Sequence, residues 1–219
     1  MNKKRIISTF LIGTTLSVLG AIVLFSGYAL IEPTQISAVA TTSSVTLTVG
    51  EEISLTVSGA TALTPAINST QDTSVGNSTW TVKTNSTDGY TLEFTTAEAN
   101  ALKSGTDTFT DVTTTTPVAW AEDAADYIWG YSAYGDDVAT STWGDAVACG
   151  TAEAASFTTS LLYAGFETSS ATTDAASSAA ATDQDGADTV LCIAAEQGEN
   201  VFAPSGSYAT TVTGTATVQ

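Results

Sequence analysis

Threonine alternates with aliphatic residues along several stretches of this chain, and this period of two limits its fold more than any other property. Residues 45–49 read VTLTV, residues 53–57 read ISLTV, and residues 208–218 place a threonine or alanine at every second position. Successive side chains of a β-strand point to opposite faces, so each run buries one face and exposes the other. Threonine is β-branched and suits such strands. With 42 threonines in 219 residues, the sequence predicts an all-β domain.

Two further segments extend this pattern and predict a β-hairpin. Residues 79–84 (TWTVKT) alternate, and residues 90–94 (YTLEF) alternate again after a loop that contains Asp88-Gly89. Asp-Gly between two alternating runs favours a hairpin, here with a loop longer than two residues. Helical signals are weak, and we expect at most a short turn or two within residues 96–102 and 122–126.

The chain begins with the features of an export signal. Basic residues at positions 3–5 precede an apolar stretch over residues 6–31, and Ala38-Val39-Ala40 stands before Thr41. This order is typical of a signal peptide, although the apolar stretch is also long enough for an uncleaved signal anchor. We therefore divide the chain into a signal peptide or anchor helix at 1–40 and a domain at 41–219. That domain is expected outside the cell, exported through the general secretory route, with membrane contact only through the N-terminal segment.

Within the exported part, residues 168–188 differ in composition from the rest. They are rich in alanine, serine, threonine and aspartate and contain almost no large apolar side chain. Such low-complexity segments rarely pack into a core, so we predict an exposed acidic loop.

The charge of the chain excludes several classes of function. It carries 23 acidic and five basic residues with no histidine, a net charge of −18, and only Lys83 and Lys103 are basic beyond the leader. Nucleic-acid binding requires clustered lysine and arginine, which this domain does not have. Catalytic triads and zinc sites that use histidine are also excluded. Neighbouring carboxylates on a strand point to opposite faces and cannot flank one glycosidic bond, so we expect no enzymatic activity.

Three motifs resemble a known family when they are taken in order. They are WTVKTN followed by DGYTL (residues 80–92), Trp129-Gly130-Tyr131, and PSGSY leading into TVTGTA (residues 204–216). This series resembles WxL-like β-sandwich proteins of the surfaces of Gram-positive and related bacteria. The resemblance implies a single immunoglobulin-like antiparallel β-sandwich without enzymatic activity. The Trp-x-Leu signature itself is absent, so the cell-wall binding of true WxL domains is not implied.

The chain has two cysteines, Cys149 and Cys192. In an exported domain a lone pair of cysteines favours a disulfide, which would close a loop of about 44 residues and stabilise the fold by about 4 kcal/mol. The alternative is two free buried thiols.

Aromatic residues gather between positions 120 and 143. Trp129 and Tyr131 share one face of an alternating strand, so we assign them to the core. Trp120, Tyr134 and Trp143 are the candidates for exposed side chains that stack on a sugar ring.

Three carboxylates surround a glycine near the end of the acidic segment. Asp183, Asp185 and Asp188 flank Gly186 at spacings that would let a tight loop place oxygens around Ca²⁺. The alternative is a solvated loop without a metal, and no other cofactor is expected.

These features together predict an exported, non-enzymatic protein of the cell surface with a structural or adhesive role. Its partners would be cell-wall, host or environmental glycans or surface proteins. One alternative is a carbohydrate-binding module that uses the exposed aromatics, with or without Ca²⁺. The other is a filament subunit, which requires the apolar helix at residues 6–31 to persist after export.

Overall fold

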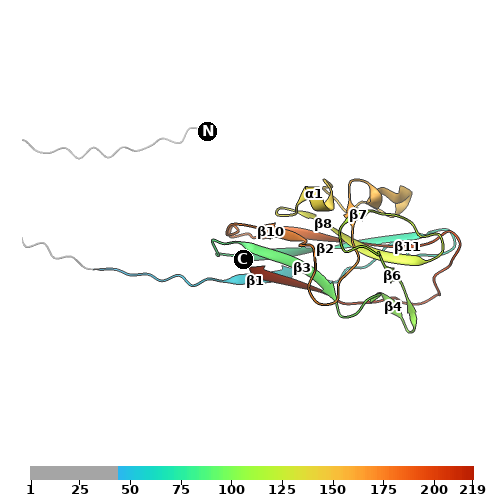
Figure 1. The fold of residues 1–219 in the computed structure, drawn as a ribbon, viewed down its shortest axis with the longest axis horizontal. Helices are drawn as coiled ribbons and strands as arrows, with labels where there is room; N and C mark the ends of the chain where they lie inside the picture. The colour runs from blue at the N-terminus through green and yellow to red at the C-terminus, as the bar shows by residue number, and fades with distance from the viewer. Residues whose placement is uncertain (1–43) are drawn as a thin grey trace, which may run out of the picture. The chain divides into compact units, whose positions relative to one another are not determined.

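A computed structural model describes residues 44–219, so the expected leader and its boundary after Ala40 lie outside the described residues. This part of the chain is mostly β-structure (Figure 1). It contains one short α-helix, α1 (Thr140–Trp143), and one 3₁₀ helix (Glu153–Thr158). The strands are β1 (Ile53–Val57), β2 (Thr73–Thr84), β3 (Tyr90–Thr96), β4 (Lys103–Ser104), β5 (Asp107–Thr108), β6 (Thr110–Asp111), β7 (Val118–Ala119), β8 (Tyr127–Gly135), β9 (Leu162–Tyr163), β10 (Ala176–Ser178), β11 (Ala187–Gln197) and β12 (Val212–Val218).

The strands form several sheets. The largest has the order β1-β2-β11-β8-β6, and a second has the order β10-β3-β12. Two small pairs, β4 with β5 and β7 with β9, complete the described β-structure. All ladders are antiparallel except the short one between β6 and β8, where Thr110 lies opposite Ile128. The expected antiparallel arrangement therefore fails at this edge, because the chain between β6 and β8 (residues 112–126) crosses back and enters β8 in the same direction as β6.

The five-stranded and three-stranded sheets face each other across an apolar core. The ring of Trp80 on β2 lies 5.2 Å from that of Phe94 on β3, and Phe94 meets Tyr131 of β8 edge-on at 6.2 Å. The packing is close at Gly214 on β12, where a Cβ atom would lie 2.6 Å from the Trp80 ring. Trp129 and Tyr131 are buried in this core, as the alternation of their strand predicts.

The C-terminal strand confirms the sequence pattern most closely. Along β12 the half-buried positions Val212, Gly214, Ala216 and Val218 alternate with exposed threonines. The strand begins four residues later than the alternating run, since the backbone of Ala209 pairs with Lys103 instead of with β3.

The predicted hairpin over residues 79–94 is wrong. Its two halves are real strands, but β2 pairs with β1 and β11, whereas β3 pairs with β10 and β12. The loop between them therefore crosses from one sheet to the other. Apolar side chains of both strands meet across the core instead of lying side by side, and the Trp80–Phe94 contact is the result.

The predicted strand at residues 45–49 is also absent. Residues 53–57 do form β1, but residues 44–52 pair with no strand of the described chain. Val45, Leu47 and Val49 are 92%, 85% and 74% exposed. Alternation alone cannot form a strand that has no neighbour to accept its hydrogen bonds.

The segment 168–188 is not one exposed loop. It contains β10, which pairs with β3, and both Ala175 and Ala176 are buried. Its last two residues belong to β11. Alanine is small enough to pack where β10 approaches the core, so a segment without large apolar residues still contributes to it. Neither residues 96–102 nor residues 122–126 form a helix.

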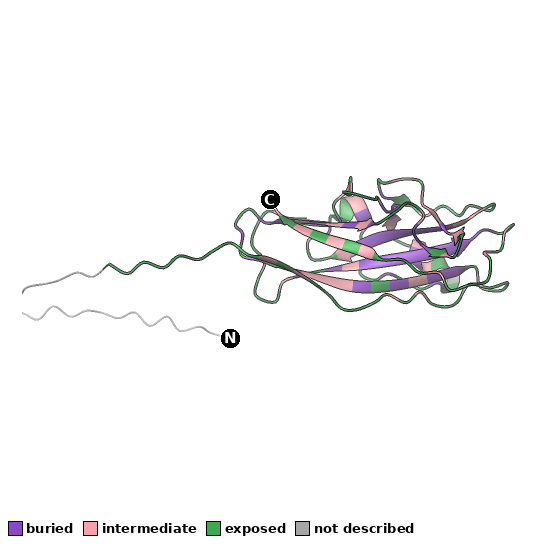
Figure 2. Ribbon diagram, turned by 90° about the horizontal axis from the view of Figure 1, so that it is seen from below, coloured by how far each residue is buried: buried purple, intermediate pink, exposed green. Residues whose placement is uncertain are grey.

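Strand β11 is the centre of the domain and is buried on both faces. Leu191, Ile193 and Ala195 face the core between the sheets. Cys192 and Ala194 point the opposite way into a second apolar cluster. Figure 2 shows the buried residues concentrated in the long strands, while the peripheral strands alternate between intermediate and exposed. The five-stranded sheet thus lies between two apolar layers.

Candidate functional site

The second apolar cluster is formed by the chain between α1 and the end of β9, which covers the outer face of the five-stranded sheet. Phe157, Leu161 and Tyr163 pack there against β11. A disulfide between Cys149 and Cys192 fixes this covering segment to the middle of the central strand, with a Cα–Cα distance of 5.3 Å. The predicted disulfide is confirmed, and it joins two layers of the domain.

Trp120 belongs to the edge of this outer layer. Its ring meets Tyr163 at 5.0 Å and Phe157 at 5.5 Å, both edge-on. The indole N–H donates a hydrogen bond to the carboxylate of Glu196, which is 8% exposed at the end of β11. Burial raises the pKa of Glu196, the hydrogen bond from Trp120 lowers it, and the charges of Glu122 and Asp72 raise it further. Trp120 is therefore half-buried and engaged in packing.

Trp143 is fully buried, so the expectation that it is exposed is wrong. It ends α1, its ring lies 5.1 Å from that of Tyr131, and its indole N–H donates to the carbonyl of Asp174 at 2.9 Å. Tyr134 is half-buried and packs against the outer apolar cluster. The three candidate aromatics thus lie at different places in the packing and form no common flat surface. No local motif indicates that α1 turns its tryptophan inward.

The three carboxylates proposed as calcium ligands do not converge. Asp183 accepts hydrogen bonds from the backbone N–H groups of Asp185 and Gly186, both at 2.9 Å, and so closes the turn. Asp188 accepts the hydroxyl of Thr81 at 2.6 Å on the neighbouring strand. Among residues 44–219 the structure brings together no group of three acidic or cysteine side chains suited to a metal ion. The Asp183 side chain thus serves a turn, and the Asp188 side chain a contact between strands.

A polar depression beside α1 is the best candidate for a ligand site in the described residues. It has a volume of about 440 Å³, within the range of small-molecule sites. It lies where the loop after β8 and α1 meet the chain leading into β10. Its polar lining combines two carboxylates with several hydroxyls, from Asp137, Thr142, Thr172, Thr173, Asp174 and Ser177. Sequence reasoning missed this site because its two walls are about 35 residues apart along the chain.

The carboxylates of this depression differ in their surroundings. Asp137 accepts the hydroxyl of Tyr90 at 2.8 Å, and burial together with Asp137 raises the pKa of that tyrosine. Partial desolvation and the charge of Glu93 raise the pKa of Asp174. Behind the lining, Glu167 accepts hydrogen bonds from both the backbone N–H and the hydroxyl of Thr172. The depression therefore has a negative potential and offers both donors and acceptors to a hydroxyl-rich or cationic ligand.

A second depression of about 520 Å³ lies beside the disulfide. It is lined mainly by small residues and includes Cys149 and one carboxylate, Glu153. With fewer convergent polar groups it is a weaker candidate for a specific ligand.

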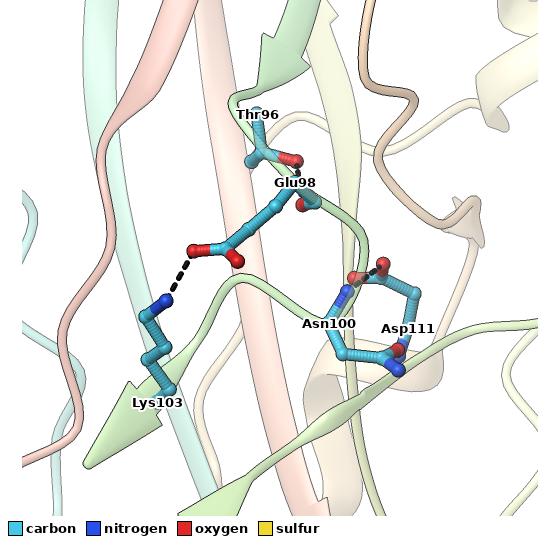
Figure 3. Close-up of polar contacts among 5 residues, drawn as sticks. All are labelled: Thr96, Glu98, Asn100, Lys103 and Asp111. Atoms are coloured by element: carbon cyan, nitrogen blue, oxygen red, sulfur yellow. Dashed lines mark hydrogen bonds and ion pairs between the residues drawn. The ribbon is translucent and has the colours of Figure 1, made fainter. Parts of the chain in front are cut away.

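Two reciprocal hydrogen bonds between Asn100 and Asp111 join the turn after β3 to the end of β6 (Figure 3). The backbone N–H of Asn100 donates to Asp111 at 2.7 Å, and the backbone N–H of Asp111 donates to the Asn100 side chain at 2.8 Å. Asn100 has φ of 51°, a conformation that asparagine adopts more readily than most residues. Burial raises the pKa of Asp111, while Asn100 and Trp129 lower it. These contacts close a turn and serve a structural role.

The nearby ion pair between Glu98 and Lys103 is the one salt bridge in the described part of the chain (Figure 3). Both side chains are about half exposed, so the pair contributes little to stability.

Across residues 44–219 we find no helix with the length and apolar character needed to cross a membrane.

Comparison with models of known protein families, with curated proteins and with solved structures gives no match.

Proposed function

We propose that this protein is an exported, non-enzymatic component of a bacterial cell surface with a structural or adhesive role. The observation that carries the proposal is the disulfide between Cys149 and Cys192. Disulfides persist in oxidising compartments and are rare in the cytosol. Together with the basic, apolar and Ala-Val-Ala features of residues 1–40, the crosslink favours export.

The fold we assign to it is a single immunoglobulin-like β-sandwich. Two observations support this assignment: the two main sheets pack face to face, and β2 and β3 follow each other in the chain but lie in opposite sheets. The resemblance of residues 80–92, 129–131 and 204–216 to WxL-like surface proteins points the same way. In this proposal the domain is a scaffold held away from the cell.

The surface chemistry supports contact with neutral or cationic partners. The outward positions of β12 are threonines, and the domain beyond the leader has two lysines, Lys83 and Lys103. Such a surface repels anionic polymers and offers hydroxyls for hydrogen bonding. We therefore propose glycans or surface proteins as partners.

A second candidate, a carbohydrate-binding module, rests on the depression beside α1. Exposed aromatic side chains do not support this candidate, since Trp143 is fully buried and Trp120 and Tyr134 are engaged in packing. Saccharide hydroxyls would instead meet Asp137, Asp174 and the threonine hydroxyls. A glycan array tests this second candidate: a module that uses the depression shows saccharide selectivity that Asp174→Asn abolishes and that Asp145→Asn, outside the depression, leaves unchanged. Selectivity that survives Asp174→Asn would contradict it.

The main proposal is tested by cell fractionation combined with a membrane-impermeant amine label. Exported protein is recovered in the surface or culture fraction and is labelled at Lys83 or Lys103 on intact cells. Recovery only from the cytoplasm, without labelling until the cells are lysed, would overturn it.

A further inference from the structure

The tripeptide Asn-Ser-Thr occurs three times between residues 68 and 87, starting at Asn68, Asn77 and Asn85. These are half of the six asparagines in the chain. Serine and threonine account for 23 and 42 of the 219 residues, so a random order would place Ser-Thr after about 2% of the asparagines. Asn-x-Ser/Thr is the acceptor sequence for N-linked glycans on the surfaces of exported proteins. The repeated tripeptide therefore indicates a modification site, and the structure distinguishes among the three asparagines.

Of the three tripeptides, the first is the one that lies wholly at the surface. Residues 68–70 are all exposed. The other two have an exposed asparagine followed by a buried serine, since Ser78 and Ser86 are 5% and 2% exposed. An enzyme that modifies the asparagine has to bind the two residues after it as well, and a buried serine prevents this in the folded domain. Accessibility therefore selects Asn68.

Backbone pairing and distant contacts also hold the other two asparagines in place. Asn77 lies inside β2, at a ladder position opposite Cys192 of β11. The Asn85 side chain accepts the backbone N–H of Glu52 and donates to the carbonyl of Gly50, both at 2.7 Å. Movement of either asparagine into an enzyme's active site would disturb contacts with distant parts of the chain.

The Asn68 side chain, by contrast, makes hydrogen bonds only within its own turn. Its amide oxygen accepts the backbone N–H of Thr70 at 2.9 Å and the hydroxyl of Thr70 at 2.8 Å. Its amide nitrogen donates to the carbonyl of Ala66 at 3.1 Å. That nitrogen carries two hydrogens, so a sugar can replace one while the other still bonds to Ala66. Glycosylation of Asn68 is therefore compatible with every hydrogen bond that this side chain makes.

We propose that Asn68 is the acceptor of an N-linked glycan. The co-reactant is a glycosyl donor in which C1 of the first sugar is joined to a lipid pyrophosphate. The Asn68 amide nitrogen forms a bond to C1, the bond between C1 and the phosphate oxygen breaks, the lipid pyrophosphate leaves, and the nitrogen loses one proton. The glycan adds a hydrated layer at the exposed turn before β2. This inference rests on the proposed function, because transfer of this kind requires an exported acceptor.

Mass spectrometry of the protein from the surface or culture fraction of producing cells tests this proposal. The peptide that contains Asn68 should carry the added mass of one or more sugar residues. Electron-transfer fragmentation keeps the sugar on its own residue, so it should place that mass on the Asn68 side chain. Unmodified Asn68 in exported protein would overturn the proposal and leave export standing. Unmodified protein recovered only from the cytoplasm would overturn both.

Two variants at one position provide the matched control. Thr70→Ser keeps the hydroxyl of the acceptor tripeptide and should keep the glycan on Asn68. Thr70→Ala removes the hydroxyl and should lose the glycan. Equal modification of the two variants would overturn the proposal. A sugar on the oxygen of Ser69 or Thr70, or on Asn77 or Asn85 without any on Asn68, would also overturn it.

Discussion

The disulfide that fixes the outer layer to β11 can be tested quantitatively by replacing both Cys149 and Cys192 with alanine. The two residues are 43 apart in sequence, and closing a loop of this size stabilises a fold by about 4 kcal/mol in the chain-entropy model. Both are buried, so loss of the sulfur atoms leaves small gaps that add about 1 kcal/mol each. The double variant should therefore lose about 6 kcal/mol, a large share of the stability of a typical domain.

Reduction of the wild type separates the two contributions, because it breaks the crosslink and keeps both sulfur atoms. We expect a loss of about 4 kcal/mol in the free energy of unfolding, measured by urea titration with tryptophan fluorescence. For a domain of this size that corresponds to a fall in Tm of about 8–16 °C. The reduced protein should remain more stable than the double variant.

Two controls accompany this experiment. The double variant should be insensitive to reductant. Leu161→Ala, a cavity in the same outer cluster, should lower stability by about 2–5 kcal/mol yet keep its sensitivity to reductant. A change of less than about 1 kcal/mol in the wild type's free energy of unfolding on reduction would lie far below the value from the chain-entropy model. That result would show that the crosslink does not stabilise the outer layer.

Three further outcomes follow from particular contacts. Burial raises the pKa of Glu196 in the folded state above its ordinary value, so protonation favours the folded state and stability rises as the pH falls from neutrality through that pKa. Glu196→Gln should remove this part of the pH dependence in urea titrations. An unchanged profile would contradict the assignment. Asn100→Gly should lower the free energy of unfolding by about 1 kcal/mol, because the hydrogen bond from the Asp111 backbone N–H to the Asn100 side chain is lost. Asn100→Ala should lower it by about 1 kcal/mol more, because alanine is strained at a φ of 51°. Equal thermal stability of the two variants would exclude a backbone contribution. Gly214→Ala should lower Tm and alter tryptophan fluorescence, since a Cβ atom would lie 2.6 Å from the Trp80 ring. A wild-type spectrum together with a wild-type Tm would contradict the close approach of the sheets.

The sequence predicts the positions of those strands that have one buried face and one face exposed to solvent. β12 shows this, because half-buried and threonine positions alternate along its whole length. Strand pairing was not predictable in the same way. The loop of residues 85–89 is compatible either with a hairpin or with a crossing between sheets, and only the packing of Trp80 on Phe94 decides between them.

The central strand β11 carried a signal that an alternation criterion overlooks. Residues 190–195 read VLCIAA, an unbroken apolar run, and such runs are typical of strands buried on both faces. That run indicates a second apolar layer, and Cys192 within it places the disulfide there.

The candidate site was harder to predict for a physical reason. Its walls come from Asp137 beside α1 and Asp174 before β10, which are brought together by the fold and share no local motif. The aromatic candidates failed because large rings near a strand end pack into whatever apolar space the tertiary structure leaves, as Trp143 does against Tyr131. Neither the meeting of Asp137 and Asp174 nor the burial of Trp143 can be predicted from the local sequence.

The proposal of an exported, crosslinked surface protein is tested most directly by peptide mapping without reductant, after a membrane-impermeant label is applied to intact producing cells. The account predicts labelled lysines together with a linked peptide pair that contains Cys149 and Cys192. Unlabelled protein with two alkylatable thiols, recovered only after lysis, would contradict it.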